Sequence, residues 1–125
     1  MPENKLTHID DTGSATMVSV AGKRSTERTA VAAGSVIMKP NTLERIKEAT
    51  HKKGDVLTVA KVAGIQAAKQ CSHLIPLCHP INLASVDLAF SLNQEQARVD
   101  ITASCTVTDA TGVEMEALTA VSVAA

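Results

Sequence analysis

The sequence predicts a single α+β domain, in which helices pack on one face of an antiparallel β-sheet. Two stretches, 85–92 and 98–108, alternate apolar and polar side chains as half-buried strands do. Two others, 41–53 and 55–75, repeat apolar side chains every three to four residues, as helices do. The chain has 125 residues, a length that suits one domain with one hydrophobic core. The resulting order of strand, helices, strand, strand and helix matches the α+β plan.

The strands follow from this alternation and from the segments between them. Because apolar side chains recur every second residue in 85–92 and 98–108, each strand has one dry face and one polar face. The polar link at 93–97 joins them as an antiparallel hairpin. Thr29–Met38 is predicted to form a third strand, and Met17–Val20 a short edge strand.

The first helix is predicted from its end signals as well as from its apolar stripe. Asn41 stands three residues before Glu44, which is the spacing of a capping box. Three basic residues crowd the predicted last turn, where cations complement the helix dipole. Gly54 then tolerates the left-handed backbone that closes many helices.

The second helix is predicted to run from an N-cap at Asp55 to about Ile75. Gly64 and the alanines near it have small side chains, so another backbone can approach this helix closely. We therefore expect the second helix to pack tightly against a neighbouring element.

The last helix begins near Thr111, which stands three residues before Glu114 in a second capping-box pattern. It reaches Ala125 without the Gly, Pro or terminal cation that ends most helices. From this pattern we expect the helix to be incomplete and a further strand to belong to the full fold.

Composition narrows the class of function. Aromatic residues are 1% of the chain, so base-stacking platforms are lacking and no nucleic-acid partner is expected. Three cysteines without CxxC spacing indicate neither a disulfide framework nor a metal site. The amino-terminal residues are polar and no uncharged run resembles a membrane span, so we expect a cytoplasmic protein with no membrane partner.

Charge is distributed unevenly along the chain although its formal net value is -1. From Lys23 to Lys69 there are ten Lys or Arg against four Asp or Glu, whereas from Gln70 onward there is one Arg against six acidic residues. Such asymmetry indicates a positive surface that faces an anion, with phosphates as one candidate. The alternative is that the two halves neutralise each other within the fold or across an oligomer interface.

The segment LIPLCHP, residues 74–80, is the most unusual part of the sequence. Its two prolines bracket Cys78 and His79 and force extended, stiff backbone there. Rigid presentation of an imidazole suits proton transfer or ligand contact, whereas the alternative is a helix exit with a buried thiol and a satisfied histidine. Because adjacent side chains point to opposite sides of extended backbone, the two are not predicted to form a catalytic pair.

Two further groups of residues could contact an anionic ligand. Four cations are candidates for phosphate contact, with solvated surface as the alternative for each: Arg28, Lys52, Lys53 and Lys69. Glu114 and Glu116 open the last helix, and residues two apart on a helix project to nearly opposite sides. We therefore expect only one of these carboxylates to enter a pocket, and the other to complement the helix dipole.

Several segments together resemble one family: LTHID, HKKGDV, AGIQAAK, LIPLCHP and TGVEMEALTA. This sequence resembles the molybdenum cofactor biosynthesis protein C (MoaC) family, the cyclic pyranopterin monophosphate synthases, from Leu6 to Ala125. The resemblance implies a ferredoxin-like fold, a homohexamer built as a hexamer of dimers, and an active site at a dimer interface. It implies a lyase that converts 3′,8-cyclo-7,8-dihydroguanosine 5′-triphosphate to cyclic pyranopterin monophosphate and pyrophosphate. It implies no cofactor and leaves open whether magnesium accompanies the triphosphate.

The resemblance also assigns residues. Those implied to contact the substrate are Leu77, Cys78, His79, Met115 and Glu116. Lys53, Lys69 and Arg28 are implied to hold phosphates, with His79 and Lys53 as catalytic residues.

The departure from the family lies at the carboxyl end, at Ala125. The family's last helix continues into a turn that supplies its general acid/base Asp and Lys, and a strand follows. We therefore expect residues 1–125 to be a single MoaC-like domain without the family's carboxyl-terminal tail, and its turnover to be impaired. The alternative function is a non-catalytic paralogue that binds the nucleotide or joins the oligomer.

Overall fold

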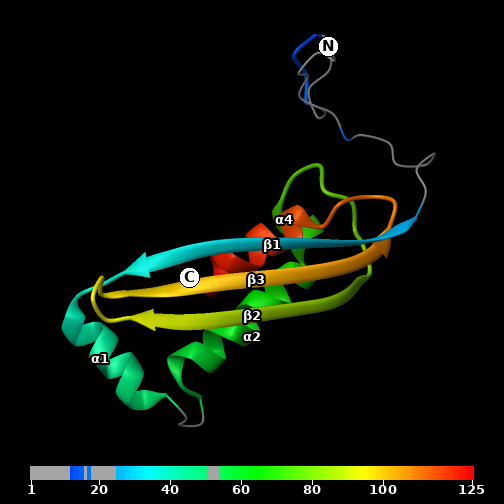
Figure 1. Cartoon of the computed structure of the whole chain (residues 1–125). Helices are drawn as coiled ribbons and strands as arrows, with labels where there is room; N and C mark the ends of the chain where they lie inside the picture. Colours follow the sequence, from blue (N-terminus) through cyan, green and yellow to red (C-terminus); the bar gives the residue numbers. More distant parts are fainter. Residues whose placement is uncertain (1–11, 16, 18–24, 51–53) are drawn as a thin grey trace.

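Helices cover one face of a three-stranded sheet in the computed structural model, which describes residues 12–15, 17, 25–50 and 54–125 (Figure 1). The elements of this part are β1 (Thr26–Ile37), α1 (Pro40–Ala49), α2 (Val56–Lys69), α3 (Cys71–Leu74), β2 (Leu83–Asn93), β3 (Arg98–Asp109) and α4 (Glu114–Ala124). The strands are antiparallel in the order β1-β3-β2. The α+β class is confirmed, whereas the ferredoxin-like topology and a further strand stay predictions.

The central strand β3 carries the core of the domain. Its alternate side chains are buried under the helices: Val99, Ile101, Ala103, Cys105 and Val107. The hairpin of β2 and β3 and the dry face of β2 agree with the alternation of the sequence. The third strand is confirmed as β1, which pairs with β3 along its whole length.

Two helix starts differ from the capping patterns of the sequence. Helix α1 begins at Pro40 with Lys39 as its N-cap, because the residue before a proline is pushed out of the helical region. Asn41 is therefore inside the helix and cannot cap it. Helix α4 begins at Glu114 after the buried Val113, and no side chain caps it, so the box starting at Thr111 is also wrong.

The start of α2 is confirmed, but its end lies earlier than predicted. Asp55 accepts a hydrogen bond from the Thr58 amide at 3.0 Å, as an N-cap does, and Gly54 before it has a φ of 77°. At Gln70 the backbone leaves the helical region, and the short helix α3 follows. This break turns Cys71 towards α4, where it is buried.

Some expectations concern residues outside the described part of the chain. Of the edge strand predicted at Met17–Val20, only Met17 is described, and it lies in no strand. The last residues of the first predicted helix, 51–53, are also outside it; α1 itself ends at Ala49.

Helices α2 and α4 approach each other closely at Gly64, as the small residues there predict. A Cβ built on Gly64 would lie 2.6 Å from Leu88 Cδ2 and 2.9 Å from the Ala120 carbonyl oxygen. Because Ala120 O belongs to the backbone of α4, it cannot move aside without shifting that helix. Glycine at this position thus sets the distance at which α2 and α4 cover the sheet.

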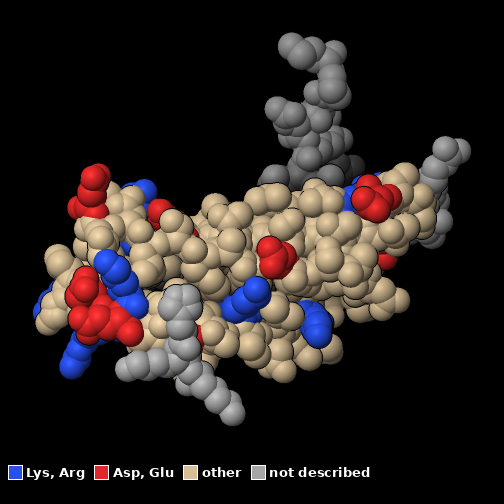
Figure 2. All heavy atoms as spheres, turned by 60° about the horizontal axis from the view of Figure 1, so that its bottom comes forward, with Lys and Arg blue, Asp and Glu red and all other residues tan. Residues whose placement is uncertain are grey.

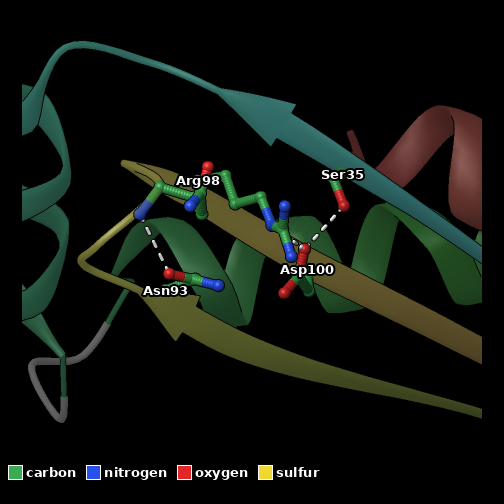
Figure 3. A network of polar contacts seen from close by, with 5 residues as sticks. Ser35, Asn93, Arg98 and Asp100 are labelled. Carbon is green, nitrogen blue, oxygen red and sulfur yellow. Dashed lines mark hydrogen bonds and ion pairs between the residues drawn. The ribbon is translucent and has the colours of Figure 1, made fainter.

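The other face of the sheet carries polar side chains that tie two strands together (Figure 3). Asp100 Oδ1 accepts hydrogen bonds from Ser35 Oγ at 2.6 Å and from Arg98 Nε at 2.8 Å. Ser35 lies on β1, directly opposite Asp100 on β3. The bond from Ser35 and the Arg98 guanidinium lower the pKa of the Asp100 carboxyl, so this network persists into mild acid. It is a structural link and lies apart from the helices.

Replacing Gly64 by alanine is expected to lower the free energy of unfolding by about 1–3 kcal/mol, because the new methyl group forces α2 away from α4. Urea denaturation measures this change. Val62→Ala is the matched control, since Val62 is exposed on the same helix and its loss should cost less than about 0.5 kcal/mol. Equal effects of the two substitutions would contradict close packing at Gly64.

Candidate functional site

The LIPLCHP segment carries a leucine in a conformation that leucine rarely adopts. Leu77 has a φ of 66°, in the left-handed region, directly before Cys78 and His79. A bulky side chain there costs roughly 1–2 kcal/mol, so the surrounding structure must hold it in place. Pro76 and Pro80 stiffen the backbone on either side. Strain of this kind concentrates at functional sites, which makes the segment a candidate ligand-binding loop.

The LIPLCHP segment leads to the start of β2, where the strand register places residues of β1 and β3 next to it. Leu83, at the start of β2, lies opposite Val107 on β3, and Val107 lies opposite Arg28 on β1. Directly opposite residues share a face, and Val107 is fully buried, so Arg28 lies on the helix-covered side. Arg28 is half-buried, and its Nε donates to Thr26 Oγ1 at 3.1 Å. The same end of the sheet leads through residues 110–113 into α4 (Figure 1).

The first turn of α4 separates its two carboxylates, as their spacing predicts. Glu114 is exposed, Met115 is half-buried and Glu116 is only 5% exposed. A Cβ on Gly112 would collide with the Glu114 carboxylate, so the glycine leaves room for this side chain to fold back over the loop. Only Glu116 faces the interior of the domain.

Buried polar groups from α3 and α4 lie near Glu116. Cys71 on α3 and Thr119 on α4 are both buried, and their Sγ and Oγ1 atoms lie 3.5 Å apart. Burial raises the pKa of the Glu116 carboxyl, and repulsion from Glu114 acts in the same direction. Hydrogen bonds from its own backbone amide and from the Cys71 thiol oppose this shift. The neutral form of the Glu116 carboxyl is therefore favoured more strongly than that of an exposed carboxyl, as is typical of functional sites.

The three cysteine thiols keep their protons at neutral pH and are poor nucleophiles. Burial raises the pKa of Cys71 to about 11 and that of Cys105 to about 11. The pKa of Cys78 is also raised, again chiefly by burial. A thiol that keeps its proton at neutral pH reacts slowly with electrophiles. That Cys78 and His79 form no catalytic pair stays a prediction.

The structure brings some of the predicted site residues together. Cys78 is close enough to Cys71, Glu116 and Glu114 for its pKa to depend on them, so the LIPLCHP segment lies near the start of α4. His79 follows Cys78 and is half-buried. Lys69 is the last residue of α2 and is exposed, two residues before Cys71. Lys53 lies outside the described residues.

Three neighbours of Glu116 were not singled out from the sequence. Cys71 and Cys105 fall on apolar stripes and look like core residues, and Thr119 has no motif signal beyond its place in TGVEMEALTA. The spacing of Glu116 and Thr119, one helical turn apart, is the single sequence feature that places them on one side of α4. The partner from α3 is visible only in the tertiary structure.

Charged side chains of both signs mix on the face shown in Figure 2. They crowd together at the end where α1 lies, and isolated charged side chains of both signs lie over the middle of this face. The described basic residues within 25–50 and 54–69 therefore form no continuous positive surface on this face. Among the described residues no group of three or more His, Cys, Asp or Glu side chains is placed to hold a metal ion.

A separate apolar pocket of about 120 Å³ lies at the opposite end of the sheet. Its lining includes Val36, Met38, Ile46, Phe90 and Ala124. Lacking charged side chains, the pocket does not suit a phosphate-bearing ligand.

No helix in the described part of the chain is long and apolar enough to cross a membrane.

The fold and this site define an α+β protein whose buried carboxyl stands beside a strained, proline-bracketed loop. A sequence model described as the MoaC family matches residues 17–125, so this chain belongs to the MoaC family. Curated relatives named cyclic pyranopterin monophosphate synthase support this assignment. The protein of Thermoanaerobacter sp. (strain X514) is 58% identical over 120 residues, which cover 96% of this chain and 76% of the relative.

Two further relatives carry the same name. The protein of Magnetococcus marinus is 59% identical over 96% of this chain and 74% of its own length. That of Clostridium perfringens (strain 13 / Type A) is 50% identical over 98% of this chain and 78% of its own length.

The unusual backbone of Leu77 predicts a specific mutational effect. Leu77→Val is expected to lower the free energy of unfolding by about 1–3 kcal/mol, because a β-branched residue is poorly tolerated at positive φ. Leu74→Val, at an exposed leucine three residues earlier, is the control and should cost less than about 0.5 kcal/mol. Thermal unfolding compares the two; similar losses would mean that Leu77 is not strained.

Burial of Glu116 predicts that Glu116→Gln stabilises the protein at neutral pH. The raised pKa means that the folded state disfavours the charged carboxylate, so stability is lost as pH rises from the unfolded-state pKa of about 4.3 through the higher folded value. The amide avoids this loss, so its advantage appears over that pH range and is absent in more acidic solution. Denaturation between pH 4 and pH 8 measures it. Glu114→Gln, at the exposed carboxylate, should show almost no such pH-dependent gain.

Proposed function

We propose that this chain acts as a cyclic pyranopterin monophosphate synthase, a lyase of molybdenum cofactor biosynthesis. The substrate is 3′,8-cyclo-7,8-dihydroguanosine 5′-triphosphate, and the products are cyclic pyranopterin monophosphate and pyrophosphate. Support comes from membership of the MoaC family and from relatives of that name at 50–59% identity. The observation that carries the proposal is that Cys78 lies within electrostatic range of Glu116 and Glu114, because it supports one site built from the family-like LIPLCHP and TGVEMEALTA segments.

In this proposal the anionic and cyclic parts of the substrate contact different groups. Arg28 and Lys69, with Lys53, hold the phosphates through charge-assisted hydrogen bonds and favour pyrophosphate as a leaving group. Glu116 contacts the purine-derived ring together with four residues: Leu77, Cys78, His79 and Met115. His79 transfers a proton or donates a hydrogen bond near the ring, with Lys53 as the second catalytic group. The buried position of Glu116 supports its role as a proton carrier.

The proposal extends to the assembly of a single MoaC-like domain. Subunits form a homohexamer in the cytoplasm, built as a hexamer of dimers, with the site at a dimer interface. The site needs no cofactor of its own, and magnesium can accompany the triphosphate. Exposed apolar side chains support a self-association surface. Val56, Val59 and Val62 follow one another at three-residue intervals on α2, and each is more than half exposed.

A single-turnover assay with the cyclised nucleotide triphosphate tests the function. Prompt release of pyrophosphate is the expected result, and His79→Ala should slow it about 100-fold or more while leaving thermal stability nearly unchanged. Lys69→Ala should weaken binding about 10-fold, most strongly at low salt. Lys61→Ala is the matched control on α2, where the lysine pairs with Asp87 at 3.8 Å, and should bind normally.

Two results would contradict this proposal. Tight binding without release of pyrophosphate would show a nucleotide-binding protein rather than a lyase. Equal affinity of Lys69→Ala and Lys61→Ala would remove Lys69 from the phosphate site.

A further inference from the structure

The Thr119 side chain forms a hydrogen bond outside its own helix, α4. Its Oγ1 atom lies 3.5 Å from Cys71 Sγ, and the two residues are 6% and 1% exposed. A hydroxyl that bonds locally in the middle of a helix donates to the carbonyl oxygen four residues earlier. Ser122 of α4 does this, donating to the Leu118 carbonyl at 2.8 Å. Thr119 instead links α4 to the first residue of α3.

Cys71 in turn supports the backbone that enters the LIPLCHP segment. Its carbonyl oxygen accepts a hydrogen bond from the Ile75 amide at 2.8 Å, at the end of α3. Ile75 has the extended backbone, with φ -107° and ψ 120°, that a following proline requires. With four residues, α3 is too short to be stable by itself, so its position depends on how its side chains pack. The buried residue of α3 is Cys71, and the polar group that it meets on α4 is Thr119.

We propose that Thr119 is a positioning residue, which holds the LIPLCHP segment against α4 through its hydrogen bond with Cys71. The bond fixes the place of α3, and α3 fixes where the strained Leu77 and the following His79 begin. Leu77, with a φ of 66°, keeps this conformation only while the surrounding structure holds it. The inference rests on the proposed function for the part that His79 takes in the reaction. The attachment of α3 can be measured without a substrate.

Replacing the hydroxyl by a methyl group separates the effect of this bond from that of apolar packing. Thr119→Val keeps the branched shape of the side chain, and valine and threonine have similar helix propensities. It removes the hydrogen-bond partner of the Cys71 thiol. Thr119→Ser keeps the hydroxyl and loses only a methyl group. Ser122→Ala is the matched control, because it deletes a hydroxyl that bonds within α4.

Hydrogen exchange of backbone amides, followed by NMR, measures the attachment of α3. In Thr119→Val the Ile75 amide should exchange about 3- to 10-fold faster, because the loss of a buried hydrogen bond eases local opening of α3. In Thr119→Ser and in Ser122→Ala it should exchange at the original rate. The Met38 amide, which donates to the Ala97 carbonyl at 2.8 Å at the other end of the sheet, should keep its rate in all three variants.

Cys71→Ala completes a double-mutant cycle with Thr119→Val. It removes the sulfur and should also accelerate exchange of the Ile75 amide. The two substitutions together should accelerate it by less than the product of their separate factors, because they delete the same bond. Independent effects of the two substitutions would overturn the proposal. An unchanged Ile75 rate in Thr119→Val, or an equal acceleration of the Met38 amide, would also overturn it.

Single-turnover release of pyrophosphate is the measurement that a merely structural role of Thr119 would not move. With saturating cyclised nucleotide triphosphate, Thr119→Val should lower the rate constant about 10-fold, because the imidazole of His79 is displaced from the ring. The dissociation constant should stay within about 2-fold, since the cations that hold the phosphates do not move. Thr119→Ser should restore the rate.

Two outcomes of this assay separate the positioning role from the proposed function. An unaltered rate constant in Thr119→Val shows that the bond does not position His79, and overturns the inference. If the unaltered chain releases no pyrophosphate, the proposed function fails, and the exchange rates of the Ile75 amide decide by themselves whether Thr119 holds the segment in place.

Discussion

The close approach of α2 and α4 at Gly64 is the constraint on which the rest of the structure depends. Without a side chain at this position, the backbone of α4 comes within contact of α2 and both helices cover the same face of the sheet. Because the helices pack closely, the end of α2 lies beside the start of α4. The break at Gln70 then turns Cys71 into that junction, where it meets Thr119. A helix-packing requirement thus brings together side chains 48 residues apart.

The same junction explains why a carboxyl can be buried in this domain. Burying a charged group costs free energy unless hydrogen bonds compensate for the lost water. Burial raises the pKa of Glu116, and hydrogen bonding to its backbone amide and to Cys71 offsets this shift only in part. Such a carboxyl reduces stability at neutral pH. Groups that lower stability in this way are typical of functional sites.

Two features of the candidate site each cost free energy of folding, one through backbone strain and the other through burial of a carboxyl. Leu77 holds a strained backbone conformation between two prolines, and Glu116 holds an incompletely solvated carboxyl. Both depend on the packing around them, since neither conformation nor burial would persist in an isolated segment.

Local patterns were sufficient for most of the elements. The alternation in β2 and β3, the cap at Asp55 and the left-handed Gly54 were all predictable, because each depends on residues close together in the sequence. The two predicted capping boxes were wrong because other features at each helix start determined where the helix begins. Pro40 outweighed Asn41 as a local signal, and the start of α4 follows the buried Val113 rather than a side-chain cap.

By itself, the sequence determined the class of fold, the hairpin and the family, since alternation, caps and motif order are all properties of neighbouring residues. It also determined that Glu114 and Glu116 point apart, because helical geometry alone requires this. Only the tertiary structure decided that β1 pairs with β3, and this pairing places Arg28 directly opposite Val107. It alone decided that Cys71 contacts Thr119 of α4, because no local rule specifies which distant side chains fill the space between two packed helices.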